Sequence, residues 1–377
     1  KGVVHVHQAV VAHDTTGRIA LDLRAGDVYW CTADPGWVTG TSYGIIAPLT
    51  NRATMIVDEA EFDVGRWYNI LGEEGVNVWY TAPTAIRSLM GFGLDPIQGK
   101  NLSSLKVLGS VGEPINEEAW PWNHKNIGKE KCPIVDSRWQ TETGAMMISP
   151  IAGITPTRPT FATLPLPGVQ PVLMDEHGNE VAQKSMEPSE GRLAMKAPWP
   201  SIARTIYGDH QRYKDTYFST FENKYFTGDG ALRDEVGYYR ITGRVDDVII
   251  VSGHNLGTAP IEDVINEHPA IAESAIVGFP HEVKGNALYG YVILKETLEK
   301  NSFDKLRKEI NQMITEHIGP IAKLNKIQFT PGLPKTRSGK IMRRILRKIA
   351  ANETDNLGDT STLLNPEIVQ EIIDNSL

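Results

Sequence analysis

A short segment near the C-terminal end of the chain presents a lysine that could meet an anion. Residues 334–340 read Pro-Lys-Thr-Arg-Ser-Gly-Lys, so Lys340 follows a flexible Ser-Gly pair. A set of apolar residues then recurs at helical spacing, namely Met342, Ile345, Leu346 and Ile349. This spacing predicts an amphipathic helix with a basic outer face, directly after a lysine that acts as a mobile point charge. Taken alone, the run is equally typical of a solvated basic helix or a nuclear signal.

A second segment crowds hydroxyls, an amide and a carboxylate behind a predicted buried strand. Residues 136–144 read Asp-Ser-Arg-Trp-Gln-Thr-Glu-Thr-Gly, with the bulky Trp139 among the polar side chains. Glu142 beside Thr141 suits Mg²⁺, which prefers carboxylate oxygens and substrate phosphates. A polar loop with capping roles would have a similar composition.

Two glycine-containing segments complete the set. Asp229 lies between two glycines, so a ribose diol could approach its carboxylate and the backbone together. Residues 251–258 contain Gly253 and Gly257, which suit a loop close to a ligand, although turns use such patterns constantly. Asp246 and Asp247, between these segments, fit a hinge or helix cap better than a metal pair.

The elements that must position these residues form an α/β pattern. Strand-like runs at 55–57, 76–80, 105–108 and 133–135 alternate with helical stretches at 66–73, 83–90 and 116–122. Such alternation predicts a parallel sheet covered by helices, and ligands of such sheets bind beyond the carboxyl ends of the strands. Residues 81–83, 111–114 and 136–143 are therefore candidates for one site.

The pattern of predicted elements changes twice after this sheet. Between 168 and 243, short strands with turn signals at 175–179 and 234–237 predict a mostly antiparallel β-unit. Beyond Arg244, helices at 261–268 and 303–317 and strands at 274–278, 288–294 and 327–330 predict a small α+β domain. We expect the boundary near residues 245–247.

Composition excludes several classes of protein. A net charge of −8 and a pI near 5.7 argue against a general nucleic-acid binder. No apolar run is long enough for a membrane span. Cys31 and Cys132 are too few for a disulfide framework, which favours a cytoplasmic setting. His5, His7 and His13 lack a cysteine or acidic partner at zinc-site spacing.

Read together and in order, these segments resemble the signature motifs of the acetyl-CoA synthetase family, within the adenylate-forming superfamily. The resemblance covers the whole chain through residues 1–5, 32–40, 80–85, 109–114, 139–144, 227–230, 243–247 and 334–340. It implies that residues 1–245 are the C-terminal part of an AMP-binding domain, and that 246–377 form a small mobile C-terminal domain with its hinge at Asp246.

The resemblance implies a two-step reaction of acetate, ATP and CoA that passes through acetyl-adenylate, with Mg²⁺ held at Glu142. ATP or AMP would contact Gly112, Glu113, Pro114, Asp136, Ser137, Arg138, Trp139, Gln140, Thr141, Asp229, Arg244 and Asn255. The acyl pocket would be formed by Val38, Thr39, Val111 and Trp139. CoA would contact Thr39, Ser252, Gly253 and Thr315, and some relatives bind a metal ion at the positions of Asn266, His268 and Ile271. The indole of Trp139 would leave room for only two or three carbons.

Lys340 matches the catalytic lysine of the adenylation step. Its charge would orient acetate and offset the negative charge that builds at the α-phosphate. Rotation at Asp246 would then withdraw Lys340 and bring the segment around Gly253 to CoA. Family members also have this lysine acetylated, so a protein acetyltransferase and a deacetylase are expected partners.

Several positions depart from the family pattern. Arg138 replaces a tryptophan, Asn255 stands where many relatives have an arginine, and Thr315 stands where some relatives bind the CoA 3′-phosphate with an arginine. The family's phosphate loop would end at the first two residues, so we expect the chain to be N-terminally truncated and inactive as a separate fragment. A propionyl- or other short-chain acyl-CoA synthetase and a non-catalytic nucleotide- or CoA-binding remnant remain alternatives.

Overall fold

The computed structural model describes residues 2–113, 115–183, 187–251, 254–282, 284–296, 302–336, 340–358, 360 and 363–377. Two compact units divide the chain between Ile241 and Thr242. Each is described below by itself. The hinge proposed at Asp246 lies in the 3₁₀ turn η4 (Val245–Asp247), just after this division.

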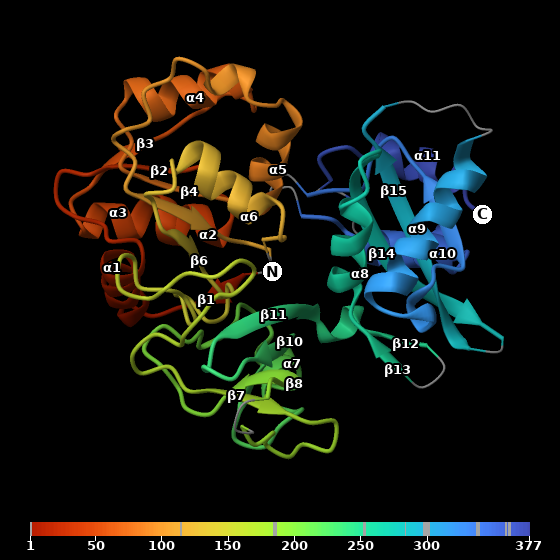
Figure 1. Ribbon diagram of the computed structural model, residues 1–377. Helices are drawn as coiled ribbons and strands as arrows, with labels where there is room; N and C mark the ends of the chain where they lie inside the picture. The colour runs from red at the N-terminus through yellow and green to blue at the C-terminus, as the bar shows by residue number, and fades with distance from the viewer. Residues whose placement is uncertain are drawn as a thin grey trace. The chain divides into compact units, whose positions relative to one another are not determined.

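The first unit contains the parallel sheet that the sequence predicts (Figure 1). Its strand order is β3-β2-β4-β5-β6, and every neighbouring pair is parallel. The strands are β2 (Val28–Cys31), β3 (Thr54–Ile56), β4 (Val78–Thr81), β5 (Val107–Ser110) and β6 (Ile134–Asp136). The sequence pattern predicted four of these strands but not β2, which lies inside the sheet.

Side chains alternate across this sheet, so each face packs against its own set of helices. Trp30, Trp79 and Leu108 point to the face covered by α4 (Val64–Glu73), α5 (Pro83–Gly91) and α6 (Ala119–Trp122). Tyr29 and Tyr80 point to the opposite face. That face is covered by α1 (Gln8–Ala20), the π-turn η1 (Ser42–Ile46) and α3 (Ala47–Thr50), while α2 (Val38–Thr41) leads into η1.

The antiparallel unit predicted between 168 and 243 is a four-stranded sheet with the order β11-β10-β8-β7. Its strands are β7 (Pro171–Met174), β8 (Ser189–Met195), β10 (Tyr225–Arg233) and β11 (Tyr239–Arg244). Helix α7 (His210–Tyr217) packs on β10, and Tyr217 stacks on Tyr225 with ring centroids 5.2 Å apart. A two-stranded pairing of β1 (Val3–Val4) with β9 (Thr205–Ile206) joins the start of the chain to this region.

The second unit is the small α+β domain that the sequence predicts. Its sheet contains β12 (Ile249–Val251), β13 (His254–Leu256), β14 (Ile271–His281), β15 (Gly285–Leu294) and β16 (Lys326–Phe329). Helices α8 (Thr258–Asn266) and α9 (Phe303–His317) pack on one face. Helices α10 (Arg343–Ala350) and α11 (Glu367–Asp374) pack on the other. The predicted apolar face of the helix after Lys340 is confirmed, since Ile345, Leu346 and Ile349 are all buried.

Candidate functional site

The carboxyl ends of β4, β5 and β6 are joined by hydrogen bonds. The backbone N–H of Val111 donates to the carbonyl of Thr81 at 3.1 Å, and that of Ser137 donates to the carbonyl of Ser110 at 3.0 Å. The Ser137 hydroxyl also donates to Ser110 and lies 2.6 Å from the Tyr80 hydroxyl. Three candidate segments, at 81, 111 and 137, therefore share one edge, as expected for a parallel sheet.

The segment after β6 is tied to the antiparallel sheet through Asp229. The Arg138 guanidinium pairs with the Asp229 carboxylate, and both side chains are about nine-tenths buried. Gln140 donates from Nε2 to the carbonyl of Thr227 at 2.7 Å, and its Oε1 accepts from the Tyr225 hydroxyl at 3.0 Å. Three residues expected at the nucleotide therefore lie together, and Arg138 makes a structural bond that the sequence could not indicate.

Asp136 ends β6 in a buried position. Burial raises the pKa of Asp136 to about 7, against which the neighbouring Ser110 hydroxyl acts. Desolvation penalises the carboxylate more than the neutral acid, so ionisation of this side chain opposes folding near neutral pH.

The sequence around Glu113 forms a second polar cluster at the same edge. Gly112 has a φ of +98°, a left-handed conformation that suits glycine. The Glu113 carboxylate accepts from the Thr84 hydroxyl and from Arg87, whose Nη2 lies 2.8 Å away. Thr84 and Arg87 belong to α5, so the segment after β5 is fixed to that helix. Pro114 lies outside the described residues.

Aromatic packing brings together part of the expected acyl pocket. The rings of Trp139 and Tyr43 meet edge to face, with centroids 4.9 Å apart and planes at 69°. Val111, Tyr43 and Tyr80 are buried in one apolar cluster, against which Trp139 packs. Val38 and Thr39 begin α2, the helix that leads into the π-turn containing Tyr43, and both are half-buried.

Four consecutive carbonyls fix the loop that contains Glu142. His5 bridges two segments, with Nε2 at 2.8 Å from the Thr141 carbonyl and Nδ1 at 3.1 Å from the Ser201 carbonyl. The Glu142 carbonyl accepts from the N–H of Ala203 at 2.9 Å. The Thr143 carbonyl accepts from the Trp199 indole at 2.8 Å and from the Ser201 hydroxyl at 2.7 Å.

The fourth carbonyl, that of Gly144, binds His13. The distance from its oxygen to Nε2 of His13 is 2.5 Å. Burial lowers the pKa of His13, so its neutral ring donates this bond. In the sequence, His5 and His13 were candidates only for a metal site. Their actual partners are backbone carbonyls far along the chain, for which a single sequence carries no signal.

Glu142 is buried on this fixed loop. The pKa of Tyr213 is raised to about 12, first by burial and then by the negative charge of Glu142. A buried carboxylate on a rigid loop fits Mg²⁺, which prefers oxygen ligands. Among the described residues no group of three or more His, Cys, Asp or Glu side chains could hold a metal ion.

In the second unit, a backbone hydrogen bond joins Lys340 to Thr336. The Thr336 N–H donates to the Lys340 carbonyl at 2.9 Å, and the Lys340 residue itself is exposed. The residues between them, 337–339, lie outside the described part, as do Ser252 and Gly253. The side chains of Asn255 and Asp246 are likewise outside it. Arg244 is exposed at the end of β11.

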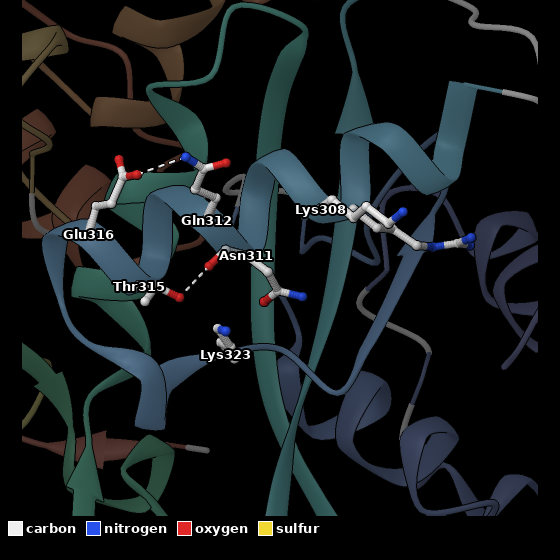
Figure 2. A pocket seen from close by; sticks show the side chains of 7 residues that line it. Lys308, Asn311, Gln312, Thr315, Glu316 and Lys323 are labelled. Carbon is white, nitrogen blue, oxygen red and sulfur yellow. Dashed lines mark hydrogen bonds between the residues drawn. The ribbon is translucent and has the colours of Figure 1, made fainter.

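Thr315 lies in a hollow on α9 (Figure 2). Its hydroxyl donates to the carbonyl of Asn311 at 2.6 Å. Three cations, those of Arg307, Lys308 and Lys323, also line the hollow, together with one carboxylate, that of Glu316.

Asn266, His268 and Ile271, the second set of metal ligands expected from the resemblance, lie in the second unit. His268 accepts from the Ala270 N–H at Nδ1, at 3.2 Å, and its Nε2 lies 3.5 Å from Glu309. The amide oxygen of Asn266 accepts from Ser274 at 2.9 Å, and Ile271 is buried. The metal-binding role of Asn266, His268 and Ile271 stays a prediction.

Comparison with known proteins decides the family. The AMP-binding enzyme family matches residues 1–207, and the AMP-binding enzyme C-terminal domain matches residues 260–340. The chain belongs to the AMP-binding enzymes. It is 53% identical over 379 residues to an acetyl-coenzyme A synthetase of Syntrophobacter fumaroxidans and 54% identical to one of Alcanivorax borkumensis. All of the chain is matched, yet it spans only 57% and 58% of the length of these curated relatives.

A solved structure shares the fold of this AMP-binding chain. It is the anthranilate CoA ligase AuaEII in complex with anthranoyl-AMP, with a TM-score of 0.80 and 24% identity. The match covers 93% of this chain and 65% of the other. The fold expected from the sequence is thereby confirmed. No helix among the described residues is long and apolar enough to cross a membrane.

Proposed function

We propose that this chain takes part in the ATP-dependent ligation of acetate to CoA. Identity above 50% along the whole chain to proteins named acetyl-coenzyme A synthetase carries this proposal. The shared edge at β4, β5 and β6, linked to Asp229, supports it, because a nucleotide of an open parallel sheet binds beyond such strand ends.

The first step joins acetate to AMP. An acetate oxygen attacks the α-phosphorus of ATP, a P–O bond forms, and the bond to the β-phosphate oxygen breaks to release pyrophosphate. The segments at 112–113 and 136–141 would contact adenine and the α-phosphate, and Asp229 with Arg244 would bind the ribose. Asn255 and Pro114 belong to the same proposed nucleotide set. Mg²⁺ bound at Glu142 would neutralise charge on the phosphates.

Lys340 would act in this step alone. Its ammonium would orient the acetate carboxylate and stabilise the charge that develops at the α-phosphate. A turn at Asp246 would then exchange Lys340 for the segment containing Ser252 and Gly253. In the second step the CoA thiolate attacks the carbonyl carbon of acetyl-adenylate, a C–S bond forms, and AMP leaves with the electron pair of the C–O bond.

The substrate pockets follow from the same assignment. Val38, Thr39, Val111 and Trp139 would enclose the acetyl group, with Trp139 held in place by Tyr43. Thr39 and Thr315 would contact CoA, and the cations beside Thr315 support an anionic ligand there. Acetylation of Lys340 by a protein acetyltransferase would remove its charge and stop adenylation, and a deacetylase would restore it. Such substrates and partners fit a cytoplasmic enzyme.

The test replaces Lys340 by Ala in the protein at its natural length. ATP–pyrophosphate exchange with acetate should be abolished, while thioester formation from supplied acetyl-adenylate and CoA should persist. Lys305→Ala is the matched control, because Lys305 is an exposed lysine of α9 in the same unit and should leave both activities unchanged. Equal loss of both half-reactions in the Lys340 variant would contradict the assigned role.

A further inference from the structure

The loop that contains Lys340 is closed at its base by hydrogen bonds between its two ends. We name residues 334–342 the Lys340 loop. The Met342 N–H donates to the Pro334 carbonyl at 2.8 Å, and the Thr336 N–H donates to the Lys340 carbonyl at 2.9 Å. The Lys340 N–H also donates to the Thr336 hydroxyl at 3.2 Å. The backbone position of Lys340 is therefore set by this base.

One side chain from the C-terminal segment binds the base on both of its polar atoms. The Asn365 Oδ1 accepts from the Lys335 N–H at 3.1 Å, and its Nδ2 donates to the Leu333 carbonyl at 2.9 Å. The neighbouring Leu364 N–H donates to the Lys335 carbonyl at 2.8 Å. An amide has one acceptor and one donor group, so Asn365 pairs with the loop as the backbone of a neighbouring strand would.

Asn365 is itself held by a packed helix. Its carbonyl accepts from the Ile368 N–H at 3.2 Å, at the start of α11. Ile368, Val369 and Ile372 of that helix are buried in one cluster with Leu333 at the loop base. The C-terminal helix, the amide and the loop therefore form one packed unit.

A salt bridge to the sheet also holds the loop base. The Lys335 ammonium lies 2.6 Å from the Glu273 carboxylate on β14, and both side chains are at least four-fifths buried. Lys335 is thus fixed to the sheet through its side chain and to the C-terminal segment through its backbone. A base held by both contacts can present Lys340 in one place.

From this geometry we infer that Asn365 is a positioning residue for Lys340, acting through the backbone of the Lys340 loop. The inference rests on the proposed role of Lys340 in adenylation. Asn365 does not need to touch substrate. Removal of its amide frees one N–H and one carbonyl at the loop base, and the base can then shift relative to α11.

The expected consequence is confined to one half-reaction. Misplacement of a reacting group by about 1 Å can cost roughly 100-fold in rate. Lys340 is proposed to act only in adenylation, so a shifted loop should slow ATP–pyrophosphate exchange and leave thioester formation from acetyl-adenylate intact. A residue that merely stabilised the fold would affect both steps together.

The experiment compares Asn365→Ala with Asn375→Ala in the protein at its natural length. Asn365→Ala should lower kcat/KM for exchange by about 10- to 100-fold without changing the thioester step. Asn375 is a matched control, because its exposed amide bonds the Glu371 carbonyl within the same C-terminal segment. Its replacement should change neither step.

A second variant guards against a simple folding defect. Asn365→Asp keeps the acceptor for the Lys335 N–H but loses the donor to the Leu333 carbonyl, so its loss of exchange should be intermediate. Equal loss of both half-reactions in the two Asn365 variants would overturn the inference, and so would full exchange activity in Asn365→Ala. Lys340→Ala, assayed beside them, separates the causes. If it spares exchange, the role of Lys340 fails; if it abolishes exchange while Asn365→Ala does not, only the present inference fails.

Discussion

Replacement of His5 by alanine tests whether the loop around Glu142 is held from the start of the chain. The variant removes both ring nitrogens, which lie 2.8 Å from the Thr141 carbonyl and 3.1 Å from the Ser201 carbonyl. A hydrogen bond contributes about 0.5–1.5 kcal/mol net, and a buried acceptor left unpaired costs about 1–3 kcal/mol. A neutral imidazole carries one N–H, so one of the two carbonyls loses its donor, and we expect a loss of about 1–3 kcal/mol in the free energy of unfolding.

The assay is thermal unfolding followed by calorimetry. For a unit of this size, 1 kcal/mol corresponds to roughly 2–4 °C in Tm, so His5→Ala should lower the Tm by about 2–12 °C. His7→Ala is the control, because His7 is exposed and its side chain makes no capping bond at the start of α1. An exposed substitution of this kind should change stability by less than about 0.5 kcal/mol. If the two variants lower Tm equally, the reasoning about the carbonyl contacts is refuted.

Three further predictions follow from the same site. Burial raises the pKa of Asp136 to about 7, above its unfolded value, so the folded state binds the extra proton and stability falls as pH rises from about 4 to 7. Asp136→Asn should therefore raise Tm at pH ~8 and leave it unchanged near pH ~4. An equal change in Tm at both pH values would contradict the burial argument. Arg138→Met should lower the free energy of unfolding by about 3–5 kcal/mol, because it leaves the Asp229 carboxylate buried without its arginine. The double variant with Asp229→Asn should be less destabilised than the single one. Thermal unfolding that shows simple additivity of the two substitutions would count against the pair. Trp139→Gly should extend the range of accepted acids to longer chains in an acyl-CoA synthesis assay, and an unchanged chain-length profile would defeat the pocket proposal.

Local patterns predicted most of the elements because burial forces a period on each of them. The alternation of short apolar runs with helical stretches predicted β3 to β6 and their helices, since strands covered on both faces are continuously apolar. The strand β2 was overlooked, although its Val-Tyr-Trp-Cys run has the same character. Strand β14 is longer than the predicted strand at 274–278. Gly278 and Pro280 are poor strand formers, so the prediction ended there, yet the hairpin with β15 pairs both of them.

The candidate site was likewise predicted only in part from the sequence. The sequence indicated which polar segments follow the buried strands, and the parallel topology requires those segments to meet at one edge. It could not indicate that Arg138 would bind Asp229, because ninety residues of chain separate them and only the packing of two sheets joins them. The nucleotide, acyl and CoA roles of the site residues remain predictions that the assays above address.

The sequence by itself determined the order of the motifs, the period of each helix and strand, and the presence of a lysine after a Ser-Gly pair, because these depend on residues close together in the chain. Only the tertiary structure decided what holds those motifs in place. His5 and His13 bind carbonyls of the Glu142 loop, and Asn365 binds the base of the Lys340 loop. Backbone carbonyls and N–H groups are the same at every residue, so no side-chain pattern marks which of them a distant donor or acceptor will meet.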